Sequence, residues 1–105
     1  MAYVAKYSEA AAQRAEIDEL PGSVLIEFGV DWCPHCQNAQ PFIEVAVQGY
    51  PDLHHLKVED GPGRRLGRSF RVKLWPTLIL MRDGQEVGRV VRPGNTQEIA
   101  ELLLG

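Results

Sequence analysis

The run "SVLIEFG", residues 23–29, is the feature that most restricts what this chain can fold into. Apart from Glu27, its larger side chains are apolar at both odd and even positions, so a strand made from it would have two apolar faces. Such a strand is typical of the centre of a sheet that is covered on both faces by helices. The chain has 105 residues and is 45% hydrophobic, which predicts a single domain over residues 1–105 with one core.

A second strong pattern spans residues 77–91, "TLILMRDGQEVGRVV". Two strand-like runs flank Asp83 and Gly84, and Asp-Gly is a preferred pair for a tight hairpin turn. A further strand is predicted for residues 53–60, "LHHLKVED", and an edge strand for residues 3–7, "YVAKY".

Four helices are predicted between and after these strands. They comprise residues 9–20, Cys33 to about Gly49, a short segment within 61–72, and 98–104. Ser8 is suited to cap the first helix, Pro34 fits the first turn of the second, and Pro41 is expected to kink it. Asn95, three residues before Glu98, predicts a capping box for the last. The order β-α-β-α-β-α-β-β-α predicts an α/β fold with a mixed central sheet and helices on both faces.

The chain has only two cysteines, Cys33 and Cys36, at the predicted start of the second helix. A bridge over so short a loop stabilises a fold little, so the pair indicates chemistry. Residues three apart lie on one helix face, where the two sulfurs can meet. The free N–H groups and positive dipole end of a helix start stabilise a thiolate, so we expect Cys33 to be the nucleophile. Cys36, one turn deeper, is expected to resolve the mixed disulfide.

A metal site is the competing interpretation, because His35, His54 and His55 accompany the cysteine pair. A second Cys-x-x-Cys motif is missing from the sequence, however, and neighbouring residues 54 and 55 of a strand point to opposite faces. The sequence therefore predicts no bound metal, although a metal-binding domain stays open as a less favoured alternative.

The motif "WCPHC", the preceding "LIEF", Pro41 and "WPT" at 75–77 together resemble the thioredoxin family over nearly the whole chain. The resemblance implies the thioredoxin fold and a thiol–disulfide oxidoreductase that acts on protein disulfides without a metal or organic cofactor. In that family a cis-proline lies beside the disulfide and shapes the substrate groove, a role that falls here on Pro76. The alternative is a thioredoxin-like binding or chaperone module whose cysteine pair is vestigial.

Glu27, six residues before Cys33, matches the family's buried aspartate, which relays protons to the deeper cysteine. Lys57 matches the lysine that pairs with that acid. Burial without a full partner is expected to raise the pKa of Glu27 and to suit it as a base for Cys36. The alternative is that its longer side chain reaches water.

The chain departs from thioredoxins proper at two places. Pro34 and His35 replace the usual Gly-Pro pair, and this dipeptide is similar to that of the bacterial periplasmic disulfide oxidants. An imidazole beside a thiolate stabilises the reduced form, so His35 is expected to make the disulfide a stronger oxidant. Trp75 replaces a small β-branched residue before the cis-proline. Trp32 and Trp75 could be ordinary core aromatics. We expect instead that they form an apolar rim of the substrate groove.

Charge is unevenly distributed around the net value of −3: residues 1–60 hold ten acids and three bases, residues 61–105 four acids and eight bases. Five of these bases fall within ten residues: Arg64, Arg65, Arg68, Arg71 and Lys73. One interpretation is that these bases form a solvated face of the protein. The alternative is that they border the substrate groove and attract acidic substrates. No basic leader and no apolar run of ~20 residues is seen. We therefore expect a cytoplasmic monomer that binds neither nucleic acid nor membrane and is served by an unidentified reductase or thiol donor.

Overall fold

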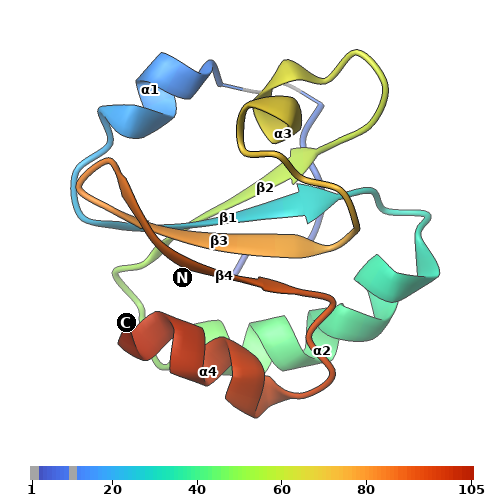
Figure 1. The fold of residues 1–105 in the computed structure, drawn as a ribbon. Coiled ribbons are helices and arrows are strands. Elements are labelled where there is room, and N and C mark those ends of the chain that lie inside the picture. Colours follow the sequence, from blue (N-terminus) through green and yellow to red (C-terminus); the bar gives the residue numbers. More distant parts are fainter. Residues whose placement is uncertain (1–2, 10–11) are drawn as a thin grey trace.

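A computed structural model describes residues 3–9 and 12–105. Its centre is a four-stranded sheet with the order β2-β1-β3-β4 (Figure 1). The strands are β1 (Ser23–Gly29), β2 (His54–Glu59), β3 (Thr77–Arg82) and β4 (Gln85–Val91). β1 pairs with β2 in parallel, whereas the pairs β1–β3 and β3–β4 are antiparallel, so the predicted mixed sheet is confirmed.

Helices cover both faces of the sheet, as predicted. They are α1 (Arg14–Asp18), α2 (Pro34–Gln48), α3 (Arg65–Ser69) and α4 (Thr96–Leu104). α1 and α3 lie on one face, α2 and α4 on the other (Figure 1). Among the described residues, the model contains no helix with the length and apolar character that crossing a membrane requires.

The alternation of side chains along β1 decides what lies beneath each helix layer. Val24, Ile26 and Phe28 belong to the core cluster that includes residues of α1 and α3, whereas Leu25 belongs to the cluster of α2 and α4. Because side chains alternate along a strand, Glu27 shares the face of Leu25. Glu27 is fully buried, which places a carboxylate between the sheet and the α2–α4 layer.

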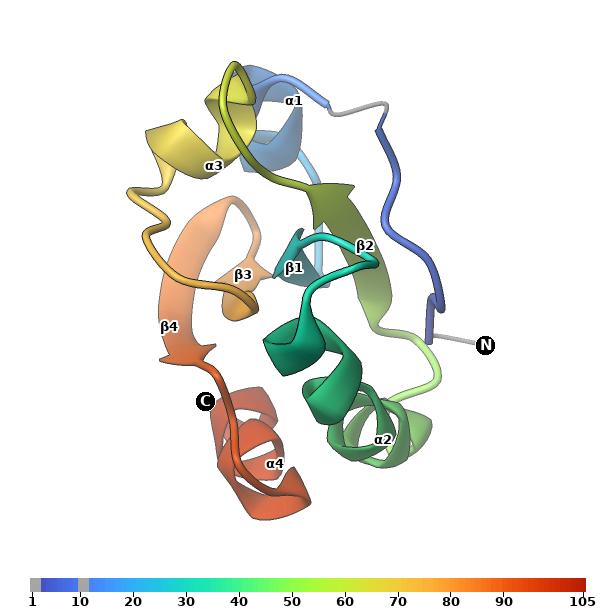
Figure 2. The same ribbon diagram turned by 90° about the vertical axis from the view of Figure 1, so that its right-hand side faces the viewer.

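The N-terminus differs from the prediction. Residues 3–7 form no strand; only Ser8 makes a parallel bridge, with Val58 of β2. We call residues 3–8 the N-terminal segment; it runs alongside β2 (Figure 2). The first helix is also shorter than predicted: it begins after Gln13, whose N–H donates to the Glu16 carboxylate, and Ser8 does not cap it. Residues 10 and 11 of the predicted helix lie outside the described residues.

The turns and caps of the C-terminal half follow the sequence closely. Asp83 and Gly84 have φ angles of 49° and 83°, the left-handed values that a tight hairpin turn requires. Asn95 caps α4 through a 2.9 Å hydrogen bond from the Glu98 N–H to its side chain. The Glu98 carboxylate accepts from the N–H of Gly94 rather than from that of Asn95, which differs from the predicted capping box.

Candidate active site

The two cysteines lie where β1 leads into α2. Cys33 is the N-cap residue of α2, with an extended backbone, and Pro34 is the first helical residue. Both cysteines are free thiols; Cys33 is 6% exposed and Cys36 only 1%. The structure therefore bears out the predicted placement, with Cys33 at the helix start and Cys36 one turn deeper.

Two tryptophans stand beside the cysteines. Trp32 is 72% exposed, and its ring meets that of Trp75 edge to face at 6.1 Å between centroids. Trp75 packs against the cluster that contains both cysteines, and its indole N–H donates to Asp60 Oδ2 at 2.8 Å. The Trp75–Pro76 peptide bond is cis, as the resemblance implied. Trp32 is thus no core residue, whereas Trp75 is half-buried.

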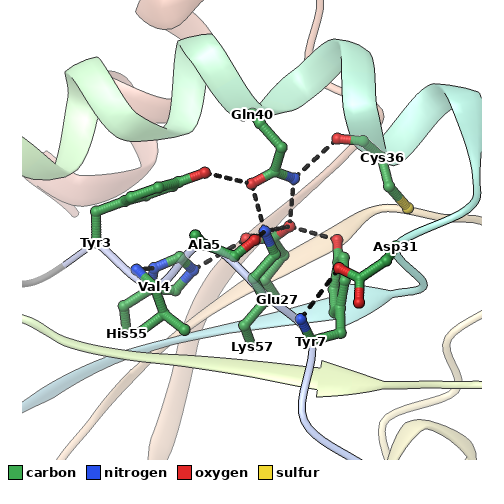
Figure 3. Close-up of polar contacts among 10 residues, drawn as sticks. All are labelled: Tyr3, Val4, Ala5, Tyr7, Glu27, Asp31, Cys36, Gln40, His55 and Lys57. Carbon is green, nitrogen blue, oxygen red and sulfur yellow. Dashed lines mark hydrogen bonds and ion pairs between the residues drawn. The ribbon is translucent and has the colours of Figure 1, made fainter.

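Strand register brings Glu27 and Lys57 together. The parallel pairing of β1 and β2 sets these two residues opposite each other, and His55 lies two positions before Lys57 on the same face. His55 Nε2 is 2.9 Å from Glu27 Oε1, and its Nδ1 accepts a hydrogen bond from the N–H of Val4 (Figure 3). Since Nδ1 is an acceptor, Nε2 carries the ring proton and donates to the carboxylate.

The other oxygen of Glu27 has its own donors. Gln40 Nε2 donates to Oε2 at 2.9 Å and to the carbonyl oxygen of Cys36 at 2.8 Å. Lys57 Nζ lies 3.9 Å from Oε2 and donates to Gln40 Oε1 and to the carbonyl oxygen of Ala5. Among the described residues every buried side-chain nitrogen and oxygen has a partner, so Glu27 belongs to a complete network.

The expected rise in the pKa of Glu27 is wrong. Burial does raise this pKa, but the hydrogen bonds from His55, Tyr7 and Gln40 and the charge of Lys57 outweigh burial and hold the pKa below its usual value. Burial lowers the pKa of Lys57, although Glu27 and other negative groups oppose this. The alternative in which Glu27 reaches water is also wrong, because the side chain is fully buried.

Tyr7 enters the site from the N-terminal segment. Its hydroxyl donates to Glu27 Oε2, and the residue packs in the same buried cluster as Cys36. Gly29 makes room for it, because a Cβ built there would lie 2.6 Å from the Tyr7 oxygen and 2.5 Å from the Cys36 sulfur. Burial, followed by the charge of Glu27, raises the pKa of Tyr7, so the phenol stays neutral.

The pKa of Cys36 is raised to about 11. Burial is the main cause, and the neighbouring Cys33 adds to it, while hydrogen bonds from the Val30 backbone and the Tyr7 hydroxyl oppose it. Cys36 is therefore a thiol at neutral pH and must lose a proton before it can attack.

The sequence does not indicate Tyr7 and Gln40 as site residues, and it suggests His55 only as a ligand in the alternative metal site. His55 shares a strand face with Lys57, and Gln40 lies one helical turn after Cys36, so both positions were readable from local periodicity. Gly29, inside a buried strand, signalled a close approach by some other group. Nothing in the local sequence identified Tyr7 as that group.

The structure supports neither a metal site at the cysteine pair nor a compact cluster of the five bases between residues 64 and 73. Within residues 3–9 and 12–105 no group of three or more His, Cys, Asp or Glu side chains is placed to hold a metal ion. His54 is exposed on the face opposite buried His55. The five clustered bases separate: Arg64 pairs with Glu59 at 2.9 Å, while Arg71 and Lys73 are exposed just before Trp75.

His35 and Arg92 complete the surroundings of the cysteines. His35 is exposed in the first turn of α2, between the two cysteines in sequence. Arg92, absent from the sequence prediction, donates from Nε to the carbonyl oxygen of Trp75 at 2.8 Å. This contact places a cation at the backbone of Trp75, just before the cis-proline.

Comparison with known proteins agrees with this geometry. The family model described as Thioredoxin matches residues 4–104. The thioredoxin of Chlamydia trachomatis is 34% identical over 82 residues, which cover 78% of this chain and 80% of that protein. Thioredoxin H2-1 of rice, Oryza sativa subsp. japonica, is 35% identical over 68 residues, which cover 65% of this chain and 49%, about half, of the rice protein.

A solved structure shows the same fold at higher identity. Thioredoxin 2 from Pseudomonas aeruginosa PAO1, in its reduced form, is 57% identical, with a TM-score of 0.85 and coverage of 94% of this chain and 92% of that one. The chain therefore belongs to the thioredoxin family, has the thioredoxin fold, and is a thiol–disulfide oxidoreductase.

Proposed function

We propose that the protein exchanges disulfides with protein substrates, with Cys33 as the attacking thiol and Cys36 as the resolving thiol. The observation that carries this assignment is their unequal placement at the start of α2. Cys33 sits at the N-cap, where the first N–H groups of the helix have no intrahelical partner, and Cys36 lies deeper, against Tyr7.

The exchange takes two steps. The Cys33 thiolate attacks one sulfur of the substrate disulfide, and the other substrate sulfur leaves with the electron pair. Cys36 then loses its proton and attacks Cys33, which releases the second substrate sulfur and leaves a Cys33–Cys36 disulfide. Two electrons pass to the substrate, and in our proposal Glu27 and Lys57 assist the proton transfers.

The surroundings of the cysteines suit an extended substrate. Trp32, Trp75 and Pro76 would line the groove, and His35 and Pro34 would tune the stability of the thiolate. A reductase or a thiol donor would return the electrons after each turnover. We further propose that the protein acts as a cytoplasmic monomer, with no nucleic acid or membrane as partner and no metal or organic cofactor.

Reduction of insulin by dithiothreitol tests this function. The wild-type protein should accelerate the reaction, and Cys33→Ser should abolish the acceleration. Equal activity of the two proteins would favour a binding module with a vestigial cysteine pair. The potential of the pair in glutathione buffers would then show whether the protein gives or takes electrons in a cytosol.

A further inference from the structure

The Tyr7 hydroxyl lies between Glu27 and Cys36 (Figure 3). It donates to Glu27 Oε2, and the Cys36 sulfur lies beside it, because a Cβ built on Gly29 would lie 2.6 Å from the Tyr7 oxygen and 2.5 Å from that sulfur. Both atoms occupy the space that a side chain at position 29 would need, so only glycine fits there. The hydroxyl therefore lies next to both the buried carboxylate and the resolving thiol.

We propose that Tyr7 is the proton-transfer group of Cys36: its hydroxyl takes the thiol proton while it passes its own proton to Glu27. This inference rests on the proposed function, in which Cys36 resolves the mixed disulfide. It gives the N-terminal segment a direct part in the reaction.

The step balances as follows. The S–H bond of Cys36 breaks, its proton moves to the Tyr7 oxygen, and the phenol proton moves to Glu27 Oε2. The electron pair left on Cys36 forms the bond to the Cys33 sulfur, and the bond between Cys33 and the substrate sulfur breaks. The substrate sulfur leaves with the electron pair of the broken bond and takes a proton from water.

The chemistry of the phenol suits this role. A hydroxyl group donates and accepts at the same time, so it can pass a proton on without ever holding a charge. Burial raises the pKa of Tyr7, which keeps it neutral. In the resting protein the ionised Glu27 is a weak proton acceptor, so transfer must accompany the attack. The mixed disulfide favours transfer further, because it removes the contribution of Cys33 that raises the pKa of Cys36.

A route for the proton to leave lies next to the same groups. A cavity of about 280 Å³ is lined by Tyr7, Cys36 and Lys57, together with exposed residues of the N-terminal segment. Such a space is large enough for water. Glu27 itself does not line the cavity, so its proton would return through Tyr7 to water there.

The N-terminal segment holds Tyr7 in position. The N–H of Tyr7 donates to Asp31 Oδ1 at 3.3 Å, and the N–H of Val4 donates to His55 at 2.9 Å. Lys57 donates to the carbonyl oxygen of Ala5. The N–H of Ser8, the next residue, donates to the carbonyl oxygen of Lys57 at 2.8 Å. These contacts fix the backbone on both sides of the tyrosine, so the hydroxyl is held beside the thiol before the reaction begins.

Stopped-flow reaction of the reduced protein with dithiobis(nitrobenzoate) separates the two steps. Attack by Cys33 releases one coloured thionitrobenzoate, and resolution by Cys36 releases the second. Tyr7→Phe should leave the first phase unchanged and slow the second by about 10²-fold, since a positioned proton transfer contributes about 10²–10⁴-fold. The second phase should also need a higher pH than in the wild type.

Tyr3→Phe is the matched control. It removes a phenol hydroxyl from the same segment, one that donates to Gln40 Oε1 at 2.9 Å instead of to Glu27. Its two phases should keep wild-type rates. Equal slowing of the second phase in both variants, or an unchanged second phase in Tyr7→Phe, would overturn the proposal.

The wild-type protein supplies an independent test. In deuterated water the second phase should slow more than the first, and this excess should vanish in Tyr7→Phe. No excess in the wild type overturns the role of Tyr7 even if the variant does not fold. The proposed function fails separately, if Cys33→Ser keeps the first phase at its wild-type rate.

Discussion

Glu27 Oε1 and His55 Nε2 are joined by a 2.9 Å hydrogen bond between two side chains that are wholly inaccessible to solvent. The opposite nitrogen of His55 accepts from the N–H of Val4, so one imidazole ties the buried carboxylate to the N-terminal segment. The acid of the redox site is therefore also part of the fold, and changes to it should affect both stability and turnover.

Glu27→Gln should lower the free energy of unfolding by about 1–3 kcal/mol at pH 7. The new amide N–H₂ is a donor placed against other donors, so it leaves at least one of them without an acceptor. The variant should also slow the release of the second thionitrobenzoate. Chemical denaturation of the reduced protein measures the first effect. An unchanged stability would mean that the network relaxes around glutamine at no cost.

The stability effect should depend on pH with a definite sign. The folded-state pKa of Glu27 lies below its ordinary value of about 4.3. Its contribution is therefore fully present above that value and is lost as pH falls through the folded-state pKa. The stability gap between wild type and Glu27→Gln should narrow below about pH 4. A gap that widens with acid would contradict the lowered pKa.

Gly29→Ala should displace Tyr7 or Cys36, since the added Cβ would lie 2.5 Å from the Cys36 sulfur. We expect a loss of about 1–3 kcal/mol in unfolding free energy, as for other overpacked cores, and a slower resolving step. Gly49→Ala is the control, because its φ is −76° and its Cβ would meet nothing closer than 3.7 Å. Similar losses in both variants would show that the space at Gly29 has no special role.

His35→Gly should make the disulfide more reducing, because it removes an imidazole that stabilises the thiolate of the reduced form. About 30 mV corresponds to about 1.4 kcal/mol for this two-electron couple, so even a modest shift is measurable in glutathione buffers. His35→Gln keeps the side-chain size without a titratable ring and should shift the potential in the same direction. A shift in the glycine variant alone would indicate backbone flexibility as the cause.

Arg71 and Lys73 should speed reaction with acidic disulfide peptides, because exposed charges at a rim mainly raise association rates. The double variant Arg71→Asn, Lys73→Asn should slow that reaction at low salt and have little effect on a basic peptide. Asparagine is chosen because Arg71 has a φ of 59°. Arg65→Asn with Arg68→Asn, on α3, removes the same charge elsewhere. Equal rates throughout would leave Arg71 and Lys73 as a solvated face.

Local patterns predicted much of this protein. The two apolar faces of residues 23–29, the Asp83-Gly84 turn and the cysteines at a helix start depend on neighbours in sequence, and the structure confirms each of them. His55 and Gln40 follow the same periodicities and were within reach of such reasoning.

The remainder depends on contacts between distant residues. Tyr7 reaches Glu27 across 20 positions, and Val4 reaches His55 across 51. No local pattern marks these partners, so the sequence predicts a strand over residues 3–7 and gives no indication of the role of Tyr7. The pKa of Glu27 was misjudged for the same reason: burial was readable from the sequence, whereas the donors that outweigh burial were not.

The order of the two cysteines is tested most directly by trapping the mixed disulfide. Cys36→Ser should capture substrate proteins from a lysate in complexes that dithiothreitol releases, because Cys33 still attacks and no internal thiol resolves the product. Cys33→Ser should capture none. Capture by Cys33→Ser and not by Cys36→Ser would contradict the assignment of Cys33 as the nucleophile.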